Sequence, residues 1–324
     1  MTILRRGLLA APALLVPLLA GKARAETWPD RPVRILVPYT PGAINDTLAR
    51  LVGERMMDAV GQLGVVENRP GASGSLAIAA TAQAGDNYTI CVANTANLTM
   101  NPFLFANTGY DSTKDIAPLC VTTRLMNCLA VRTDSGIGSL RELIARAKAQ
   151  PGKLSYASSG AGSSPHLAAE LFRVRAGIEL THVPYRGSAP GIADLLGGRV
   201  DMTIDNLPNV LPHVQGGRLK ALAVTGSERD PTLPDVPTFA EAALPGYEVY
   251  VWFGFVGPAA MPQPVRDRLS KAIIGIVQGA ETAERIQRAG AAVWVQDQSQ
   301  MAALIRSELE KWGGVIRAAG LRLE

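Results

Sequence analysis

The chain has 324 residues, of which 47% are hydrophobic and 19% are charged, so it can bury a sizeable core and is not a disordered polypeptide. Length alone favours two domains. The net charge of +4 comes from residues 1–25, which contain four basic residues and no acid; the remaining 28 basic and 28 acidic residues balance, which argues against nucleic-acid binding.

Residues 1–25 are typical of a cleaved secretory signal peptide. The pair Arg5-Arg6 precedes an apolar stretch over residues 7–20, and the small-residue site Ala23-Arg24-Ala25 predicts cleavage before Glu26. The apolar stretch contains two prolines and is shorter than the roughly 20 residues of a membrane-spanning helix. The residues around the arginine pair match a twin-arginine signal only loosely. We therefore expect Sec export of a soluble protein to the periplasm.

Short apolar runs alternate with helical patterns along the rest of the chain. The runs predict strands at residues 33–37, 65–66, 88–92, 129–131, 154–157, 200–204 and 222–224. Helical patterns lie between several of these strands. Such alternation predicts parallel α/β sheets with helices on both faces.

Capping residues mark the starts of three predicted helices. Ser139 and Glu142 have the spacing of a capping box. Ser164 is predicted as an N-cap with Pro165 at the first helical position. Ser299 is predicted as the N-cap of the last helix, which has an apolar stripe at helical spacing.

Three cysteines, Cys91, Cys120 and Cys128, are too few and too widely spaced for a disulfide scaffold or a zinc knuckle. The favoured interpretation is that they are small apolar residues in strands. A bridge between Cys120 and Cys128, the nearest pair, is the alternative.

Two loops leave a predicted strand and open a helix, at residues 38–46 and 158–166. Ligands of parallel α/β sheets bind outside the carboxyl ends of the strands. Gly42 permits close backbone approach in the first loop, and Asn45 or Asp46 can cap its helix. Small residues in the second loop leave backbone N–H groups bare at a helix N-terminus. The two loops are therefore predicted to hold the two ends of one diacid.

No catalytic motif is complete in this chain. Neither loop matches a P-loop, and Gly160-Ala161-Gly162 lacks the third glycine of a dinucleotide-binding motif because Pro165 stands there. No nucleophile elbow is present, and the three histidines have no metal-ligand spacing. We predict no catalytic residue, no metal and no cofactor.

Several motifs resemble those of one protein family. They are WPDRPVR at 28–34, VPY at 37–39, PG at 41–42, VENRPGA at 66–72, SSGAGSSPHL at 158–167, HVPYRGSAP at 182–190, DLLGG at 194–198, DN at 205–206 and LPDVPT at 233–238. In this order the chain is similar, over residues 28–324, to the Bug family of periplasmic solute-binding proteins. These proteins are the receptors of tripartite tricarboxylate transporters.

The resemblance implies a two-lobed α/β fold of the flytrap-like, type II periplasmic-binding-protein class, with a hinge between discontinuous domains. Residues 26–126 and 247–324 would form lobe 1, and residues 127–246 would form lobe 2. The protein would close on its ligand as a monomer and dock to the membrane subunits of the transporter.

The resemblance also implies which residues bind the ligand. One carboxylate would be held by the first loop and by Asn94-Thr95, and the other end by the second loop, with Tyr185 and Asp205 nearby. The predicted ligand-binding residues are Tyr39, Thr40, Gly42, Ala43, Asn45, Asp46, Asn94, Thr95, Ser158, Ser159, Gly160, Gly162, Ser163, Ser164, His166, Tyr185 and Asp205.

The first loop departs from the family pattern. Ala43, Ile44 and Asn45 follow the single Gly42, where family members have further glycines and a threonine. These side chains narrow the room for backbone approach or for a bridging water. Asn94 stands where the family often has glycine and could donate a hydrogen bond directly, which would favour a shorter or differently shaped acid.

We predict a periplasmic receptor that captures a small organic acid, of di- or tricarboxylate type, for a tripartite tricarboxylate transporter. A sensor that reports the solute to a membrane kinase is the alternative, and a periplasmic hydrolase is a third possibility. Asp46 and Asp205 would repel a carboxylate unless each faces away, caps a helix or meets an amino group of the ligand. The identity of the acid therefore stays open.

Overall fold

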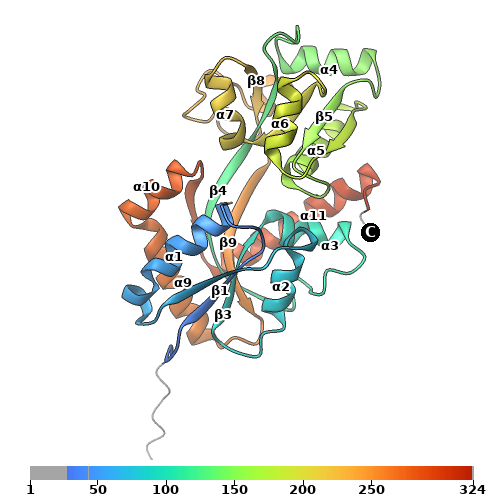
Figure 1. The fold of residues 1–324 in the computed structure, drawn as a ribbon. Helices are drawn as coiled ribbons and strands as arrows, with labels where there is room; N and C mark the ends of the chain where they lie inside the picture. Colours follow the sequence, from blue (N-terminus) through green and yellow to red (C-terminus); the bar gives the residue numbers. More distant parts are fainter. Residues whose placement is uncertain (1–27, 43, 323–324) are drawn as a thin grey trace, which may run out of the picture.

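The computed structural model describes residues 28–42 and 44–322, which form two lobes connected through strand β4 (Ile116–Arg132) and the segment that enters strand β9 (Tyr250–Pro258) (Figure 1). The predicted signal peptide, residues 1–25, lies outside the described residues. No helix among the described residues is both long enough and apolar enough to cross a bilayer.

The sheet of the first lobe has the order β2-β1-β3-β9-β4, and β10 pairs with the same part of β4. Besides β4 and β9, this sheet contains β1 (Val33–Val37), β2 (Gly64–Asn68), β3 (Thr89–Asn94) and β10 (Ala292–Gln296). Strand β1 is parallel to β2 and β3, whereas β9 is antiparallel to β3 and β4.

The sheet of the second lobe contains the other end of β4. Strand β4 lies between two antiparallel neighbours, and two further strands complete the sheet in the order β4-β7-β5-β6. These strands are β5 (Ser155–Ser158), β6 (Thr181–Pro184), β7 (Met202–Asn206) and β8 (Leu219–Val224). Strand β4 changes sheets between Met126, which pairs with β9, and Asn127, which pairs with β7.

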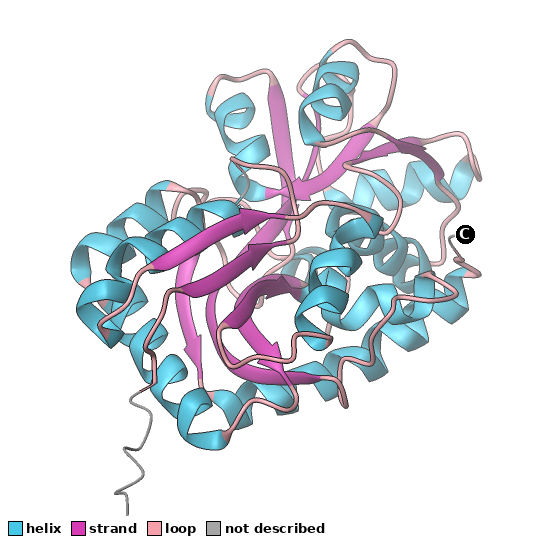
Figure 2. Cartoon of the chain, turned by 60° about the horizontal axis from the view of Figure 1, so that its bottom comes forward, coloured by secondary structure: helices cyan, strands magenta, loops and turns pink. Residues whose placement is uncertain are grey.

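Helices cover both sides of the first sheet (Figure 2). The helices of the first lobe are α1 (Ile44–Val60), the 3-10 turn η1 (Ala72–Gly74), α2 (Ser75–Ala82), the π-helix η2 (Ala96–Met100), α3 (Asn101–Leu104), α9 (Gln263–Gln278), α10 (Ala280–Arg288) and α11 (Gln298–Ala319). Those of the second lobe are α4 (Leu140–Ala149), α5 (Ser164–Ala176), α6 (Ser188–Leu196), α7 (Leu207–Gln215) and α8 (Phe239–Ala242).

One apolar cluster extends across the two lobes. It contains Met100 of η2 and Trp312 of α11 together with Leu167 of α5, all fully buried. Helix α11 therefore packs against elements of both sheets, as Figure 1 also shows. Burial of a side chain as large as Trp312 contributes roughly 1.5–3 kcal/mol or more to folding.

All seven predicted strands are present, but the prediction of parallel sheets is wrong for every pairing of β4 and of β9, in both lobes. Strands β9 and β10 and the first half of β4 are antiparallel additions that the pattern analysis did not identify. The first half of β4 contains Thr122, Thr123 and Arg124, which interrupt its apolar run. Strand β9 is apolar throughout, but without alternation a short apolar run does not separate strand from helix.

The predicted helix caps are partly correct. Ser139 does accept a hydrogen bond from the Glu142 backbone, but the Glu142 carboxylate accepts from Gly138 N and not from Ser139, so there is no capping box. Ser163, not Ser164, is the N-cap of α5. Similarly α11 is capped not by Ser299 but by Asp297, whose carboxylate accepts from Gln300 N.

The three cysteines are free and buried. A Cys120–Cys128 bridge is excluded because both residues lie on β4, where eight residues span roughly 26 Å. Burial raises the pKa of the Cys91 and Cys128 thiols to about 12. The cysteines are therefore core residues, as the favoured interpretation predicted.

Two glycines provide a matched test of the packing between β9 and β4. A Cβ at Gly254 of β9 would lie 2.4 Å from the carbonyl oxygen of Cys120, whereas a Cβ at Gly275 of α9 meets no atom within 4 Å. We expect Gly254→Ala to lower the free energy of unfolding by about 1–3 kcal/mol. Gly275→Ala should raise it by about 0.5–1 kcal/mol. Urea unfolding measures both, and an unchanged Gly254→Ala midpoint would contradict the described strand pairing.

Candidate functional site

The loops that follow β1 and β3 are joined through the Tyr39 side chain. Its hydroxyl donates to the Ser73 carbonyl oxygen at 3.3 Å and accepts from Asn94 Nδ2 at 3.3 Å. The Tyr39 carbonyl oxygen accepts from Asn68 Nδ2 at 3.1 Å. Two predicted residues, Tyr39 and Asn94, are therefore in contact at the carboxyl ends of neighbouring strands.

Asp46 is surrounded by hydrogen-bond donors in the first turn of α1. Its carboxylate accepts from Gly42 N at 3.1 Å, from Asn68 Nδ2 at 2.9 Å and from the Arg50 guanidinium at 2.9 and 3.0 Å. Burial acts to raise the pKa of Asp46, but these donors outweigh it and lower the pKa. The carboxylate is thus charged and locally balanced, and it fixes the backbone of Gly42.

A strained segment lies beside this loop. Ala72 and Ser73 have φ values of 46° and 52°, a region that residues with a Cβ rarely adopt. The Ser73 carbonyl oxygen accepts from Asn101 Nδ2 at 3.0 Å as well as from Tyr39. These contacts tie the strained segment to the π-helix region that follows β3, and π-helical turns recur at functional sites.

The other predicted residues of the first lobe differ in exposure. Thr95 is buried and accepts from Trp252 N at 2.9 Å, so it is tied to β9. Thr40 is exposed. Asn45 is 3% exposed and its Nδ2 has no hydrogen-bond partner among the described residues. Ala43 lies outside the described residues.

The second loop folds around glycine backbone. Gly160 and Gly162 have φ values of 130° and 77°, in the region that favours glycine. The Ser163 hydroxyl donates to the Gly160 carbonyl oxygen at 2.6 Å and caps α5 by accepting from His166 N. Gly162 N donates to His166 Nδ1 at 3.1 Å. His166 therefore holds the loop that precedes it.

Two imidazole rings stack beneath this loop. The His166 and His182 ring centroids are 4.0 Å apart with an interplanar angle of 12°, and Tyr156 stacks on His182 at 4.8 Å. His182 Nε2 is hydrogen-bonded to the Ser158 hydroxyl at 2.7 Å. The Tyr156 hydroxyl donates to Glu170 at 2.7 Å.

Both imidazoles are neutral at physiological pH. Burial, with a further contribution from His182, lowers the pKa of His166 to about 3. Burial also lowers the pKa of His182. Because Gly162 N donates to His166 Nδ1, the proton of that ring is on Nε2. A proton added to Nδ1 would remove this acceptor and open the loop.

The last two predicted residues lie beside the second loop. Tyr185 N donates to the Ser158 carbonyl oxygen at 3.0 Å, and its hydroxyl donates to Asp194 at 2.7 Å. Asp205 is 1% exposed, and its Oδ1 accepts from Ser188 at 2.8 Å, Asn206 N at 2.7 Å and Asn209 at 3.0 Å. Burial raises the pKa of Asp205. Its bound oxygen faces α6 and α7.

The predicted residues thus form two groups, one in each lobe. Ser159 and Ser164 belong to the second group by position, at the loop and at the first residue of α5. Among the described residues no hydrogen bond joins the two groups. The sequence analysis did not select Asn68, Ser73 or His182, although Asn68 and His182 lie within the motifs at 66–72 and 182–190.

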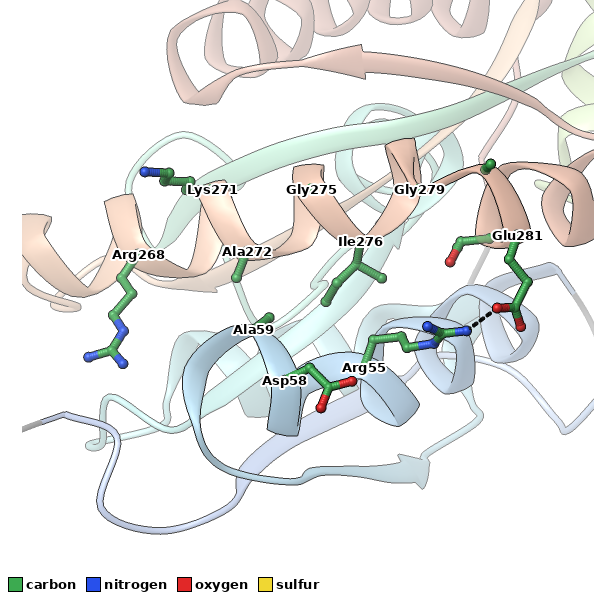
Figure 3. Close-up of a pocket in the computed structure, with 12 residues that line it drawn as sticks. Arg55, Asp58, Ala59, Arg268, Lys271, Ala272, Gly275, Ile276, Gly279 and Glu281 are labelled. Carbon is green, nitrogen blue, oxygen red and sulfur yellow. Dashed lines mark hydrogen bonds and ion pairs between the residues drawn. The ribbon is translucent and has the colours of Figure 1, made fainter.

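A groove of about 640 Å³ lies elsewhere in the first lobe, between α1, α9 and α10 (Figure 3). It is at the far end of α1 from Asp46, and its Arg55 pairs with Glu281 at 2.5 Å. Arg268 of the groove donates to the carbonyl oxygens of Trp28 and Val60. These cations are therefore engaged in holding helices together, and we place no ligand there.

The described part of the chain has no group of three or more His, Cys, Asp or Glu side chains arranged to hold a metal ion.

Comparison with known sequences gives one family. The model described as "Tripartite tricarboxylate transporter family receptor" matches residues 48–321. The UPF0065 protein in the tcbD-tcbE intergenic region of Pseudomonas sp. (strain P51) is 38% identical over 315 residues, which cover 96% of this chain and 94% of that protein. Protein BugT of Bordetella pertussis is 34% identical over 308 residues, 94% of each chain.

Comparison with solved structures gives the same result. Rpa4515 of R. palustris, solved with adipate, has a TM-score of 0.80 at 36% identity, covering 91% of this chain and 100% of that one. The periplasmic binding protein BugD has a TM-score of 0.78 at 31% identity, with the same coverage. MatC from Rhodopseudomonas palustris, with bound malate, has a TM-score of 0.77 at 31% identity over 89% of this chain and 100% of that one.

The buried imidazoles predict an acid-sensitive fold. His166 has an ordinary pKa of about 6.5 when unfolded and about 3 in the folded chain, so the unfolded state binds the proton first as the pH falls. The free energy of unfolding should then fall below pH 6.5, by up to about 1.4 kcal/mol per pH unit from this residue. His166→Asn, which keeps a δ-position acceptor for Gly162 N, should reduce that slope in urea unfolding at pH 4 to 7.

The half-exposed His213 provides the control for this prediction. His213→Gln should keep most of the wild-type slope because the imidazole is near water. Equal slopes for wild type and His166→Asn would mean that the His166 ring is charged or hydrated in the folded chain, against the described geometry.

Proposed function

The chain belongs to the tripartite tricarboxylate transporter receptor family, and from this premise we propose that it captures a small dicarboxylate between its two lobes. The family consists of solute-binding receptors of the periplasm, so the chain is a receptor and not an enzyme. The predicted two-lobed periplasmic-binding-protein fold is confirmed by the match to BugD and Rpa4515.

We propose that residues 26–126 with 247–324 form lobe 1 and that residues 127–246 form lobe 2. The change of partner along β4 supports this division, since Met126 pairs with β9 and Asn127 with β7. Closure would bring the two groups of predicted residues onto one ligand, and contacts available only in the closed form would favour that form.

The proposal of an anionic ligand rests mainly on one observation: the carboxylates of Asp46 and Asp205 already have hydrogen-bond donors from their own lobes. Asp46 accepts four hydrogen bonds from within the first lobe, and Asp205 accepts three from within the second. Neither carboxylate needs an amino group from a ligand. Asn45 Nδ2 is left without a partner, and the loop before α5 lies at a helix N-terminus. Such an arrangement favours a carboxylate over an amine or an amino acid.

The ligands bound by two relatives narrow the class of anion that we propose for this chain. Rpa4515 was solved with adipate and MatC with malate, both dicarboxylates. We propose that the present chain binds a diacid of this kind through the residues predicted from the sequence, with His166 acting mainly through the loop that it holds, because only 2% of it is exposed.

We further propose that a signal peptide over residues 1–25 directs export through Sec, that the mature chain is a monomer, and that its closed form docks to the membrane subunits of the transporter. The family match supports the association with a transporter.

A thermal-shift assay of residues 26–324 with malate, succinate and adipate tests the proposal. At a ligand concentration of 100 times Kd, binding adds about 2.7 kcal/mol, which raises Tm by several degrees. We expect a shift with at least one diacid and none with the matching diamine.

Gly162→Val should abolish the shift, because Gly162 has φ +77° and its N–H is bonded to His166. Gly152→Val is the matched control: Gly152 has φ +69° and open space around it in a turn of the same lobe, so it carries the same strain away from the site. Loss of the shift in both variants would point to general damage. A Gly162→Val variant that binds as wild type would show that the second loop is misassigned.

A further inference from the structure

Asn127 is a fully buried polar residue at the point where β4 passes from one sheet to the other. Neither its Nδ2 nor its Oδ1 has a hydrogen-bond partner in the described part of the chain. Its strand partner across β7 is Asn206, whose Oδ1 is also buried and without a partner. Three unsatisfied amide atoms therefore lie on two paired residues.

The backbone bonds of Asn127 bring these two side chains close together. Its N–H donates to Thr225 Oγ1 at 2.8 Å, and its carbonyl oxygen accepts from Thr225 N at 2.9 Å. Both groups therefore point away from β7, so Asn127 and Asn206 form a pair without mutual backbone hydrogen bonds. Side chains in such antiparallel pairs are closer than in hydrogen-bonded pairs.

The pair lies on the face of the sheet that α5 covers. Side chains alternate along a strand, so Asn127 shares a face with Leu129, and Asn206 shares a face with Ile204. Leu129 and Ile204 belong to the same buried cluster as Leu167 of α5.

The pair also lies at the same edge of the sheet as the second predicted ligand loop. Asn206 is the last residue of β7, which is parallel to β5, and the loop that leaves β5 opens α5. The N-terminus of α5 is thus at the same edge of the sheet as Asn206. From the first lobe, Ala96, which follows Asn94-Thr95, joins the same buried cluster. The two amides therefore lie at the sheet edge that carries the second predicted loop, on a sheet face whose buried cluster extends to Ala96 of the first lobe.

Buried amides without partners destabilise a fold, and a leucine of similar shape would remove that cost. Water, an ion or a ligand can supply the partner that the fold does not. A dicarboxylate held between the loops has oxygens to offer, and an amide can turn its NH2 group toward them by rotating about its Cβ–Cγ bond.

We propose that Asn127 and Asn206 contact the bound diacid and that their amide groups donate hydrogen bonds to the carboxylate held by the second lobe. This proposal rests on the proposed function. It assigns ligand binding to two uncharged residues outside the two predicted loops: Asn127 is within β4, and Asn206 is the last residue of β7.

The test measures two quantities on residues 26–324, the Tm without ligand and the affinity for malate, succinate and adipate by calorimetry. We expect Asn127→Leu to raise the Tm by a few degrees, since it removes unsatisfied buried atoms. It should weaken binding of the preferred diacid by about 10- to 100-fold, the effect of losing a hydrogen bond to a charged group.

Thr123→Val is the matched control. Thr123 is on the same strand and is fully buried, and its hydroxyl also lacks a partner within residues 28–42 and 44–322. It pairs, however, with β9 and β10 in the first lobe. We expect this variant to raise the Tm without changing the affinity. If Asn127→Leu also binds with wild-type affinity, the inference is overturned.

A second variant covers the case in which Asn127→Leu does not fold. Among the described residues the Asn206 side chain makes no capping hydrogen bond to α7, so Asn206→Ala removes no described side-chain hydrogen bond. A loss of affinity at a wild-type Tm supports the proposal, and unchanged affinity overturns it. A wild-type protein that binds none of the three diacids overturns the proposed function and this inference together, whereas binding by wild type and all variants overturns this inference alone.

Discussion

The hydrogen bonds of β4 are the constraint on which the rest of the structure depends. This one strand belongs to both sheets. It pairs with β9 up to Met126, and with β7 and β8 from Asn127 onward. Because both sheets share this continuous backbone, the two groups of predicted residues are linked through β4. The buried amides of Asn127 and Asn206 lie at the point where β4 passes from one sheet to the other.

Neither group of predicted residues contains a lysine or an arginine. In the first lobe, the neighbouring Arg50 is paired with Asp46. The other hydrogen-bond donors of the first group include side-chain amides and backbone N–H groups. In the second lobe, neutral imidazoles under the loop support backbone donors at the start of α5. A site of this kind would hold an anion through oriented N–H dipoles. The protein groups would then need little rearrangement when the ligand dissociates.

The sequence predicted what is local and missed what depends on distant pairing. The strands around Val33 and Leu154 and the loops at 38–46 and 158–166 follow from short patterns of apolar and small residues. Antiparallel β9 was missed because its place between β3 and β4 is decided by partners more than a hundred residues away. The bond between Ser158 and His182 and the pairing of Asn127 with Asn206 arise only once β4 to β7 have assembled. The ligand-binding role of the predicted residues remains a prediction.

The position of β9 in the first sheet has a consequence for the order of folding. All strands of the second sheet lie within residues 127–224 of the chain, so that lobe has its complete sheet as soon as this stretch emerges during synthesis or export. The first sheet is split between β3 and β4 until residues 250–258 arrive, and α11, which packs on both lobes, comes last. Contacts of such long sequence separation form slowly. The first sheet can therefore be completed only when most of the chain is available, so we expect the first lobe to reach its native structure after the second.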